Sequence, residues 1–215
     1  MPAYDAILFD FDGVLIDTEP LHYACWMQVL APYGIDLTWE EYARRWIGVS
    51  DRAMLHELAP LAQPPVEGAA LLEHHPAKKE LFRRRSLESQ PWVPGLPGFL
   101  ASLHGYKLAV VTSSGRGEVA PLLEAGGIRR FFGAEVFGND TPRLKPAPDP
   151  YLRAAELLGA RTPLVVEDSP AGMESARAAG FDCVMVPRAR EMPSLVEATL
   201  GRGAECGGPG RQPPR

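Results

Sequence analysis

Two aspartates, Asp10 and Asp12, lie two positions apart directly after a short apolar run, Ala6–Phe9. An apolar run that ends abruptly in a polar turn is typical of a buried strand feeding a loop. The turn holds both carboxylates close together, and close carboxylates repel unless a cation or a shared proton intervenes. With a hard divalent cation bound, one aspartate could attack a phosphorus centre and the other could carry a proton.

A second acidic pair, Glu167 and Asp168, follows another apolar run at 164–166. Asp168 can supply a further oxygen ligand, and a few protein oxygens completed by waters form the coordination that Mg²⁺ prefers. Both acids could also cap a helix that begins after Ser169, where the positive end of the helix favours negative charge. Capping and metal binding are compatible, so the sequence predicts a Mg²⁺ site here.

The elements that must position these residues alternate between strand and helix patterns. Further apolar runs occur at 108–111, 134–137 and 183–186, and helical spacing occurs at 96–103, 119–123, 151–158 and 172–179. This alternation predicts an α/β fold whose parallel sheet is covered on both faces. Ligands bind beyond the carboxyl ends of such strands. Asp10, Thr112 with Ser113, and Glu167 with Asp168 all follow strand patterns, so we expect them to face one crevice.

Residues 18–90 break the alternation, because they contain no β-branched run and have the pattern of several helices. Thr38 and Glu41 have the spacing of a capping box, Ser50 can cap the next helix, and Thr18 can cap the first. We therefore predict a core of residues 1–17 and 91–200 and a helical insertion at 18–90. The Gly- and Pro-rich segment 201–215 has almost no apolar side chains and is predicted to be disordered.

Four motifs in order resemble the haloacid dehalogenase superfamily, in the subfamily of β-phosphoglucomutase and the sugar-phosphate and phosphoglycolate phosphatases. The motifs are FDFDGVLIDTEP at 9–20, VVTSS at 110–114, KPAPDP at 145–150 and VVEDSPAG at 165–172. The match extends from about Tyr4 to Pro187, and four motifs together are far more specific than one Asp-x-Asp. The resemblance implies a Rossmann-like parallel sheet with an inserted all-helical cap domain.

The resemblance also implies roles in phosphoryl transfer. Asp10 would be the nucleophile that forms an aspartyl-phosphate, and Asp12 the general acid and base. The Thr112 hydroxyl and the Lys145 ammonium would hold the phosphoryl oxygens, whose charge fixed donors stabilise better than water does. Taken singly, Asp12 could be a turn residue, Thr112 a helix cap and Lys145 a solvated lysine.

For the metal, the resemblance implies Mg²⁺ bound by Asp10, by the backbone carbonyl of Asp12 and by Asp168. Glu167 would be a further ligand or would lie just behind the ligands.

Candidate substrate-binding residues are less sharply indicated. Ser113 follows Thr112 at a strand end, and His22 lies where the chain enters the insertion, although it could be a surface or capping residue. Lys78 is similar in position to a cap lysine that reaches substrate in the family, although a basic run normally indicates a solvated helix face. Arg52 follows Asp51, the position at which β-phosphoglucomutase carries a phosphate-binding arginine.

The expected function is Mg²⁺-dependent hydrolysis of a small phosphomonoester through an aspartyl-phosphate. One alternative is a sugar-phosphate mutase, which needs a cap cation for a second phosphate. Asp51 would repel that phosphate, so a phosphatase is favoured. Another alternative is a non-catalytic phosphate-binding regulatory protein on the same fold, against which the complete set of catalytic positions argues.

Composition restricts the partners and the location. Lys and Arg number 22 against 27 Asp and Glu, and this net charge of −5 makes nucleic acid an unlikely partner. No apolar run approaches the ~20 residues that cross a bilayer, so we expect a cytoplasmic protein without a membrane partner.

Cys25, Cys183 and Cys206 are widely separated, which predicts reduced thiols. The sequence leaves the oligomeric state open.

Overall fold

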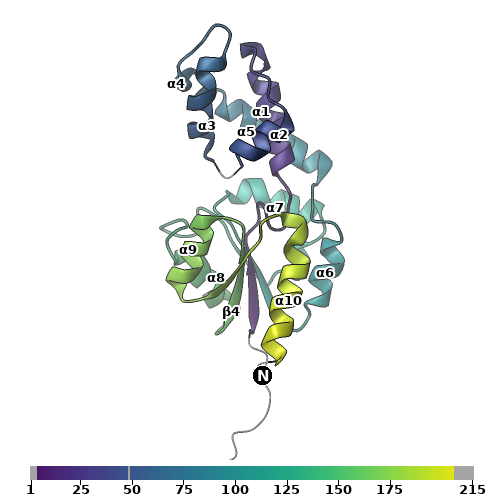
Figure 1. Cartoon of the computed structure of the whole chain (residues 1–215). Helices are drawn as coiled ribbons and strands as arrows, with labels where there is room; N and C mark the ends of the chain where they lie inside the picture. Colours follow the sequence, from purple (N-terminus) through teal and green to yellow (C-terminus); the bar gives the residue numbers. More distant parts are fainter. Residues whose placement is uncertain (1–3, 48, 206–215) are drawn as a thin grey trace, which may run out of the picture. The chain divides into compact units, whose positions relative to one another are not determined.

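The computed structural model describes residues 4–47 and 49–205, and the chain forms two compact units (Figure 1). The sheet unit comprises Met1–Asp17 and Trp92–Arg215, and the helical unit comprises Thr18–Pro91. The helical unit is inserted after the first strand.

The sheet unit is built on one five-stranded parallel sheet of order β3-β2-β1-β4-β5. Its strands are β1 (Ala6–Phe9), β2 (Lys107–Val111), β3 (Ala134–Val136), β4 (Pro163–Glu167) and β5 (Asp182–Met185). The register pairs Phe9 with both Val110 and Val166, so β1, β2 and β4 end at nearly the same level. The predicted α/β fold with a parallel sheet is confirmed.

Helices cover both faces of this sheet. They are α6 (Leu96–Ser102), α7 (Arg116–Ala125), α8 (Asp149–Leu158), α9 (Pro170–Ala179) and α10 (Met192–Glu205), with short 3₁₀ turns at Arg129–Phe131 and Ala189–Glu191. Leu8 packs among residues of α8 and α9, whereas the next residue, Phe9, meets Phe99 of α6 edge to face at 6.4 Å. In Figure 1, α8 and α9 lie on one side of the sheet and α6 and α10 on the other. Burial on both faces explains why the strands are continuously apolar.

Helix α10 corrects one prediction. Disorder was expected from residue 201, but the helix continues through Glu205. Met192 and Val196 are fully buried and anchor the helix, and extending an anchored helix costs little compared with starting one. The remaining tail, residues 206–215 with Cys206, lies outside the described residues.

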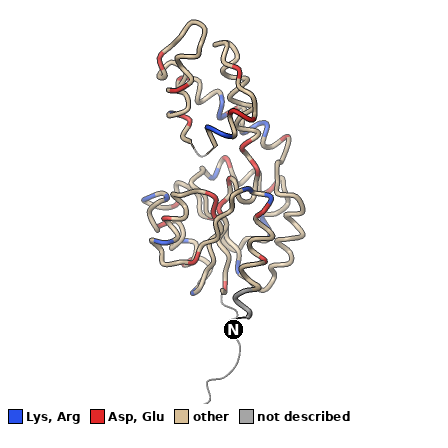
Figure 2. The backbone as a smooth tube through the Cα atoms, viewed as in Figure 1, with Lys and Arg blue, Asp and Glu red and all other residues tan. Residues whose placement is uncertain are grey.

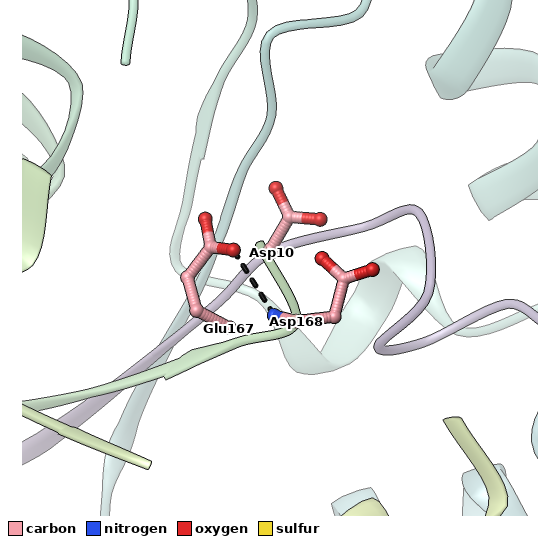
Figure 3. A group of neighbouring side chains, drawn as sticks. All are labelled: Asp10, Glu167 and Asp168. Atoms are coloured by element: carbon pink, nitrogen blue, oxygen red, sulfur yellow. Dashed lines mark hydrogen bonds between the residues drawn. The ribbon is translucent and has the colours of Figure 1, made fainter. Parts of the chain in front are cut away.

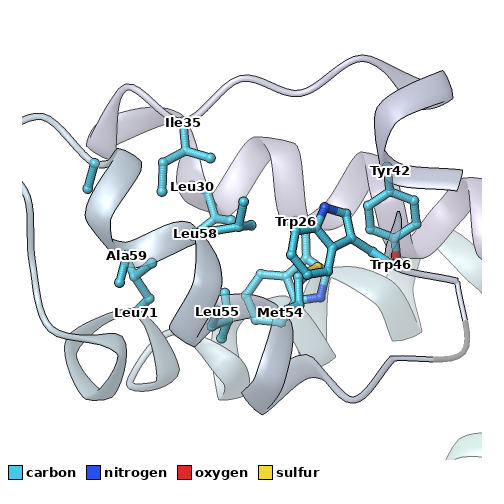
Figure 4. Close-up of a cluster of buried hydrophobic side chains, with 11 residues drawn as sticks. Trp26, Leu30, Ile35, Tyr42, Trp46, Met54, Leu55, Leu58, Ala59 and Leu71 are labelled. Carbon is cyan, nitrogen blue, oxygen red and sulfur yellow. The ribbon is translucent and has the colours of Figure 1, made fainter. Parts of the chain in front are cut away.

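The helical unit has its own apolar core (Figure 4). Its helices are α1 (Glu19–Leu30), α2 (Trp39–Arg45), α3 (Asp51–Leu58), α4 (Gly68–Leu72) and α5 (His75–Ser89), with 3₁₀ turns at Ala31–Tyr33 and Ala59–Leu61. The buried residues of this core include Trp26 and Leu30 of α1 and Met54 and Leu55 of α3. Because these residues are buried against one another, the unit has a hydrophobic core separate from that of the sheet unit.

The helix starts in this unit follow the expected capping chemistry in two cases out of three. Thr38 and Glu41 form the predicted capping box at α2, and Ser50 Oγ accepts the Ala53 N–H at the start of α3. Thr18, for which capping was only an alternative interpretation, precedes α1 and makes no side-chain capping bond. Its backbone is already near-helical (φ −90°, ψ −14°), rather than in the extended conformation typical of a capping residue.

Acidic and basic residues are interspersed along both units (Figure 2). Within the part of the chain that the structure describes, no helix is both long enough and apolar enough to cross a membrane. Cys25 and Cys183 are free thiols, as predicted.

Candidate active site

The carboxyl ends of β1, β2 and β4 bring together the polar residues that follow them. The Asp10 N–H donates to the Val166 carbonyl at 2.9 Å, and the Thr112 N–H donates to the Val136 carbonyl at 2.9 Å. The hydrogen-bond ladder therefore continues one residue beyond each strand. This continuation fixes the backbone of both residues at the edge of the sheet.

Three of the acids form an acidic cluster, defined as Asp10, Glu167 and Asp168 (Figure 3). One carboxylate oxygen from each lies within 4.8 Å of the others. Burial raises the pKa of Asp10 well above its usual value, and the neighbouring Glu167 and Asp168 charges add to the shift although Lys145 opposes it. Burial, followed by the charges of Glu167 and Asp12, raises the pKa of Asp168 to about 7. Carboxylates in such a group are stabilised by an added cation, so the donor set fits a divalent metal ion.

Lys145 places its ammonium against this cluster. Its Nζ lies 2.5 Å from Asp10 Oδ1, 2.6 Å from Glu167 Oε1 and 2.8 Å from the Val111 carbonyl oxygen. Burial would lower the pKa of Lys145, but the charges of Asp10 and Glu167 outweigh burial and raise it. The side chain is therefore a fixed cation whose three protons all have acceptors.

Glu167 is fully buried, and protein donors occupy both of its carboxylate oxygens. Oε1 accepts from Lys145 Nζ at 2.6 Å and from the Tyr151 hydroxyl at 2.7 Å. Oε2 accepts from the Asp168 N–H at 3.1 Å, the Ser169 N–H at 3.1 Å and Ser169 Oγ at 3.0 Å. Glu167 thus ties Lys145 to the start of α9. Asp10 and Asp168 are left as the members of the cluster better placed to bind a metal directly.

Two glycines allow the acids to approach this closely. Gly13 has φ +71°, and a Cβ there would lie 2.0 Å from Asp168 Oδ2. A Cβ on Gly172 of α9 would lie 1.8 Å from the carboxyl group of Glu167. Any larger residue at either position would displace a carboxylate of the acidic cluster.

Asp12 is held by a residue that we did not single out from the sequence. Ser114 Oγ donates to Asp12 Oδ2 at 3.1 Å, and the Ser114 N–H donates to Thr112 Oγ1 at 3.0 Å. Accepting this bond leaves the Thr112 hydroxyl proton available for another acceptor. Ser113, which was predicted to bind substrate and not to hold Asp12, has an exposed side chain. No sequence signal separates two adjacent serines in a loop, because the loop conformation decides which one points to Asp12.

The predicted residues of the insertion divide into two groups. Lys78 Nζ lies 2.7 Å from His22 Nδ1 and 3.3 Å from Asp51 Oδ2, and it lies 5.2 Å from the ring centre of Trp26. Lys78 is only 3% exposed, unlike the solvated helix face expected of a basic run. Among the described residues of the helical unit, Arg52 is not part of this group, and its side chain is exposed on α3.

Asp51 is the centre of these contacts. Trp26 Nε1 donates to its Oδ1 at 3.0 Å, and His75 Nε2 lies 3.1 Å from its Oδ2. We call Asp51, Lys78, His22, His75 and Trp26 the Asp51 cluster. Burial and the charge of Lys78 lower the pKa of His22 to about 3, although Asp51 opposes the shift. His22 is therefore neutral at pH 7, and the cluster pairs one carboxylate with one ammonium.

Known proteins share this arrangement of sequence and fold. Residues 7–186 match the haloacid dehalogenase-like hydrolase family. The phosphorylated carbohydrates phosphatase of Thermotoga maritima is 34% identical over 203 residues, which cover 90% of this chain and 91% of that protein. The fructose-1-phosphate phosphatase YqaB of Escherichia coli is 33% identical over 186 residues, 85% of this chain and 96% of its own.

A solved structure supports the same fold. It is a haloacid dehalogenase superfamily hydrolase of subfamily IA from Geobacter sulfurreducens, with a TM-score of 0.71 at 23% identity over 91% of this chain and 97% of that one. The four motifs, the parallel sheet and the family match agree over nearly the same residues. This chain therefore belongs to the haloacid dehalogenase-like hydrolase family, as its sequence motifs predicted.

Proposed function

We propose that the protein is a Mg²⁺-dependent phosphatase that hydrolyses a small phosphomonoester, such as a sugar phosphate, through an aspartyl-phosphate at Asp10. The observation that carries the proposal is the buried Asp10 carboxylate, with Oδ1 2.5 Å from the Lys145 ammonium and Asp168 in the same cluster. The names of the two phosphatases from Thermotoga maritima and Escherichia coli support the same reaction class.

The residues that would hold Mg²⁺ are Asp10, Asp168 and the backbone carbonyl of Asp12. Glu167 would orient neighbouring groups without binding the ion directly, because its oxygens already accept five hydrogen bonds from protein donors. When bound, the ion supplies positive charge that offsets the carboxylates and the phosphoryl oxygens. The raised pKa values of Asp10 and Asp168 fit this role, since an added cation would favour their ionised forms.

In the first half-reaction, an Asp10 oxygen attacks phosphorus while the ester P–O bond breaks. Asp12 donates a proton to the departing alcohol. Lys145 and the Thr112 hydroxyl would stabilise the charge that spreads over the phosphoryl oxygens. Lys145 is in position for this role, because its ammonium already donates to Asp10 Oδ1. When Asp10 carries the phosphoryl group, the ammonium lies beside it.

In the second half-reaction, water attacks the aspartyl-phosphate and the bond between phosphorus and Asp10 breaks. Asp12, now a carboxylate, accepts the proton of the attacking water. Inorganic phosphate leaves, and both aspartates return to their starting states. Ser114 Oγ, 3.1 Å from Asp12 Oδ2, would orient the Asp12 carboxyl group for both proton transfers.

The helical unit favours a phosphatase over a mutase. A mutase needs a cap cation available to a second phosphate, but Lys78 pairs with Asp51 in a cluster of balanced charge. The exposed Arg52 lies one residue beyond the position at which a mutase would carry its arginine. A non-catalytic phosphate-binding protein would need no buried nucleophile, whereas Asp10 is buried against Lys145. Ser113, His22, Lys78 and Arg52 stay candidate substrate-binding residues under this proposal.

A hydrolysis screen over phosphorylated metabolites, ranked by kcat/KM, tests the proposal. We expect Asp10→Asn to lower turnover on the order of 10³-fold or more, the scale of a lost nucleophile. Asp5→Asn is the matched control, because Asp5 precedes the same strand and its oxygens accept the Arg161 and Thr162 N–H groups at the opposite end. Undiminished hydrolysis by Asp10→Asn would overturn the mechanism.

A second assay tests the mutase alternative. Purified protein receives β-glucose 1-phosphate with a trace of the 1,6-bisphosphate, and both glucose 6-phosphate and inorganic phosphate are followed. We expect phosphate release without rapid isomerisation. Isomerisation that outpaces phosphate release would identify the protein as a mutase.

A further inference from the structure

Tyr151 brings a buried hydroxyl to the site from helix α8, which packs on one face of the sheet. It lies near the start of α8, in the segment that also carries Lys145, and its side chain is fully buried. A buried tyrosine hydroxyl needs a polar partner, and this one donates to Glu167 Oε1 at 2.7 Å. The residue is part of neither the expected catalytic set nor the expected metal set.

Tyr151 is linked to the Lys145 ammonium in two ways, through a shared acceptor and through a direct contact of its ring. The oxygen that accepts its hydroxyl, Glu167 Oε1, also accepts Lys145 Nζ at 2.6 Å. The Tyr151 ring lies beneath the same ammonium, with Nζ 4.8 Å from the ring centre. A cation over an aromatic face is attracted by the ring, and the attraction is larger where water is excluded.

These contacts matter because lysine is a flexible point charge. Its four-carbon side chain has many rotamers, so the position of Nζ is set by what surrounds it. Glu167 Oε1 is the acceptor that Lys145 shares with Tyr151, so the Tyr151 hydroxyl adds to the three donors on Oε2 in fixing the carboxyl group that orients Nζ. The Tyr151 hydroxyl fills the remaining site on Oε1, and the ring closes the space below Nζ.

We infer that Tyr151 is a positioning residue for phosphoryl transfer, which holds Lys145 at the nucleophile through its ring and through the shared Glu167 oxygen. This inference rests on the proposed function, since it assigns to Tyr151 an effect on a reaction in which Lys145 stabilises the phosphoryl oxygens. The backbone at Ala147, between the two residues, is pinned by Ser175 Oγ of α9 at 2.6 Å from the Ala147 carbonyl oxygen. The segment therefore has a fixed path from Lys145 to Tyr151.

The first experiment compares Tyr151→Phe with Tyr4→Phe. Both remove one hydroxyl bonded to a carboxylate in the sheet unit, but Tyr4 bonds Asp182 at the opposite end of the strands. We expect Tyr151→Phe to lower kcat about tenfold with KM changed less than about twofold, because a displaced Lys145 is felt mainly in the transition state. Tyr4→Phe should leave both constants within about twofold. Equal kinetics for Tyr151→Phe and wild type would overturn the inference.

The second experiment separates positioning from general loss of structure. If Tyr151 acts through Lys145, the Tyr151→Phe effect on kcat/KM should shrink to less than about twofold in a Lys145→Ala background. Full multiplication of the two effects would contradict the inference. The four proteins are also compared by urea unfolding, where we expect the two substitutions to be non-additive and where additivity would count against the shared contact.

The kinetic cycle also distinguishes the failure of the positioning role from the failure of the proposed function. If wild-type protein hydrolyses no phosphomonoester, the proposed function fails and the positioning role of Tyr151 in that reaction fails with it, whatever the unfolding data show. If wild type is active but the Tyr151→Phe effect persists in full without Lys145, only the positioning role fails.

Discussion

Each unit of the protein buries one lysine side chain, and the two ammonium groups differ in how many carboxylates lie beside them. In the sheet unit, Lys145 faces Asp10 and Glu167, with Asp168 in the same cluster. Among the described residues of the helical unit, the carboxylate paired with Lys78 is that of Asp51. One ammonium therefore serves three carboxylates in the first unit and one carboxylate in the second. The acidic cluster is short of positive charge, whereas the Asp51 cluster is balanced.

The pKa values of the carboxyl groups in the two clusters are shifted in opposite directions. Burial and neighbouring carboxylates raise the pKa of Asp168 to about 7. The pKa of Asp51 is lowered instead, because Lys78 and hydrogen bonds from Trp26 and Lys78 outweigh its burial. A site with carboxylates of raised pKa gains from an added cation, and a balanced site does not. Charge balance therefore indicates which of the two clusters is prepared to bind an ion.

Removing the divalent cation should give the largest effect. We expect a chelator to lower phosphomonoester hydrolysis on the order of 10³-fold and Mg²⁺ to restore it, because the acidic cluster would be left without its added charge. Mg²⁺ should also raise the thermal midpoint of wild type but not of Asp168→Asn. Full hydrolysis by metal-free protein would show that the acidic cluster needs no added cation for activity.

Exchanging each lysine for methionine compares the two clusters directly. Without Mg²⁺, we expect Lys145→Met to cost about 3–5 kcal/mol of unfolding free energy, the range for breaking a buried ion pair. Lys78→Met should cost less, since the Asp51 side chain is 30% exposed and keeps Trp26 and His75 as partners. Mg²⁺ should recover part of the loss only for Lys145→Met. Urea unfolding with and without Mg²⁺ measures this, and equal recovery in both variants would contradict the contrast.

A methyl group added at a close-packed glycine should have different effects in the two units. In Gly172→Ala the new Cβ would meet the Glu167 carboxyl group at 1.8 Å, and that group is held by five hydrogen bonds. In Gly68→Ala the Cβ would meet the His56 ring at 2.5 Å, but the exposed ring can rotate away. We expect a loss of about 2–3 kcal/mol at Gly172 and less than about 1 kcal/mol at Gly68. Thermal unfolding of both variants provides the check, and similar losses would show that the Glu167 contacts yield easily.

Acidification should have the smallest effect, and it concerns the Asp51 cluster. Burial and the nearby Lys78 charge lower the pKa of folded His22 to about 3 from its ordinary value of 6.5. Between these values the unfolded chain binds a proton that the folded chain does not, so His22 makes stability fall as the pH falls below 6.5. Urea unfolding between pH 7 and pH 5 should show a weaker pH dependence for His22→Gln than for wild type. His104→Gln, at an exposed site, is the control, and an unchanged slope in His22→Gln would contradict the assignment.

Local sequence patterns predicted much of the fold and part of the candidate active site. Apolar runs that end in polar residues located β1, β2 and β4, and in a parallel sheet the residues after those strands must share one edge. Asp10, Thr112 and Asp168 could therefore be placed together before any contact was known. Helix α10 was not among the predicted helices at all, because its stability comes from burying Met192 and Val196 and not from strong local signals.

Contacts between distant residues could not be predicted in the same way. The Ser114 bond to Asp12 and the Tyr151 bond to Glu167 depend on loop path and helix rotation, which no local spacing encodes. Lys78 illustrates the same limit. Its place in a basic run indicated a solvated helix face, yet its partners come from α1 and α3.

By itself, then, the sequence determined which elements and which reactive residues this protein has. These are the order of the strands along the chain, the helical insertion, and the aspartates, threonine and lysine of the motifs. These follow from composition and short-range periodicity, which depend only on neighbouring residues. Only the tertiary structure showed that both carboxylate oxygens of Glu167 accept hydrogen bonds from protein donors and that Asp51 neutralises the charge of Lys78. Charge balance is a sum over groups brought together from different segments, so it exists only once the chain has folded.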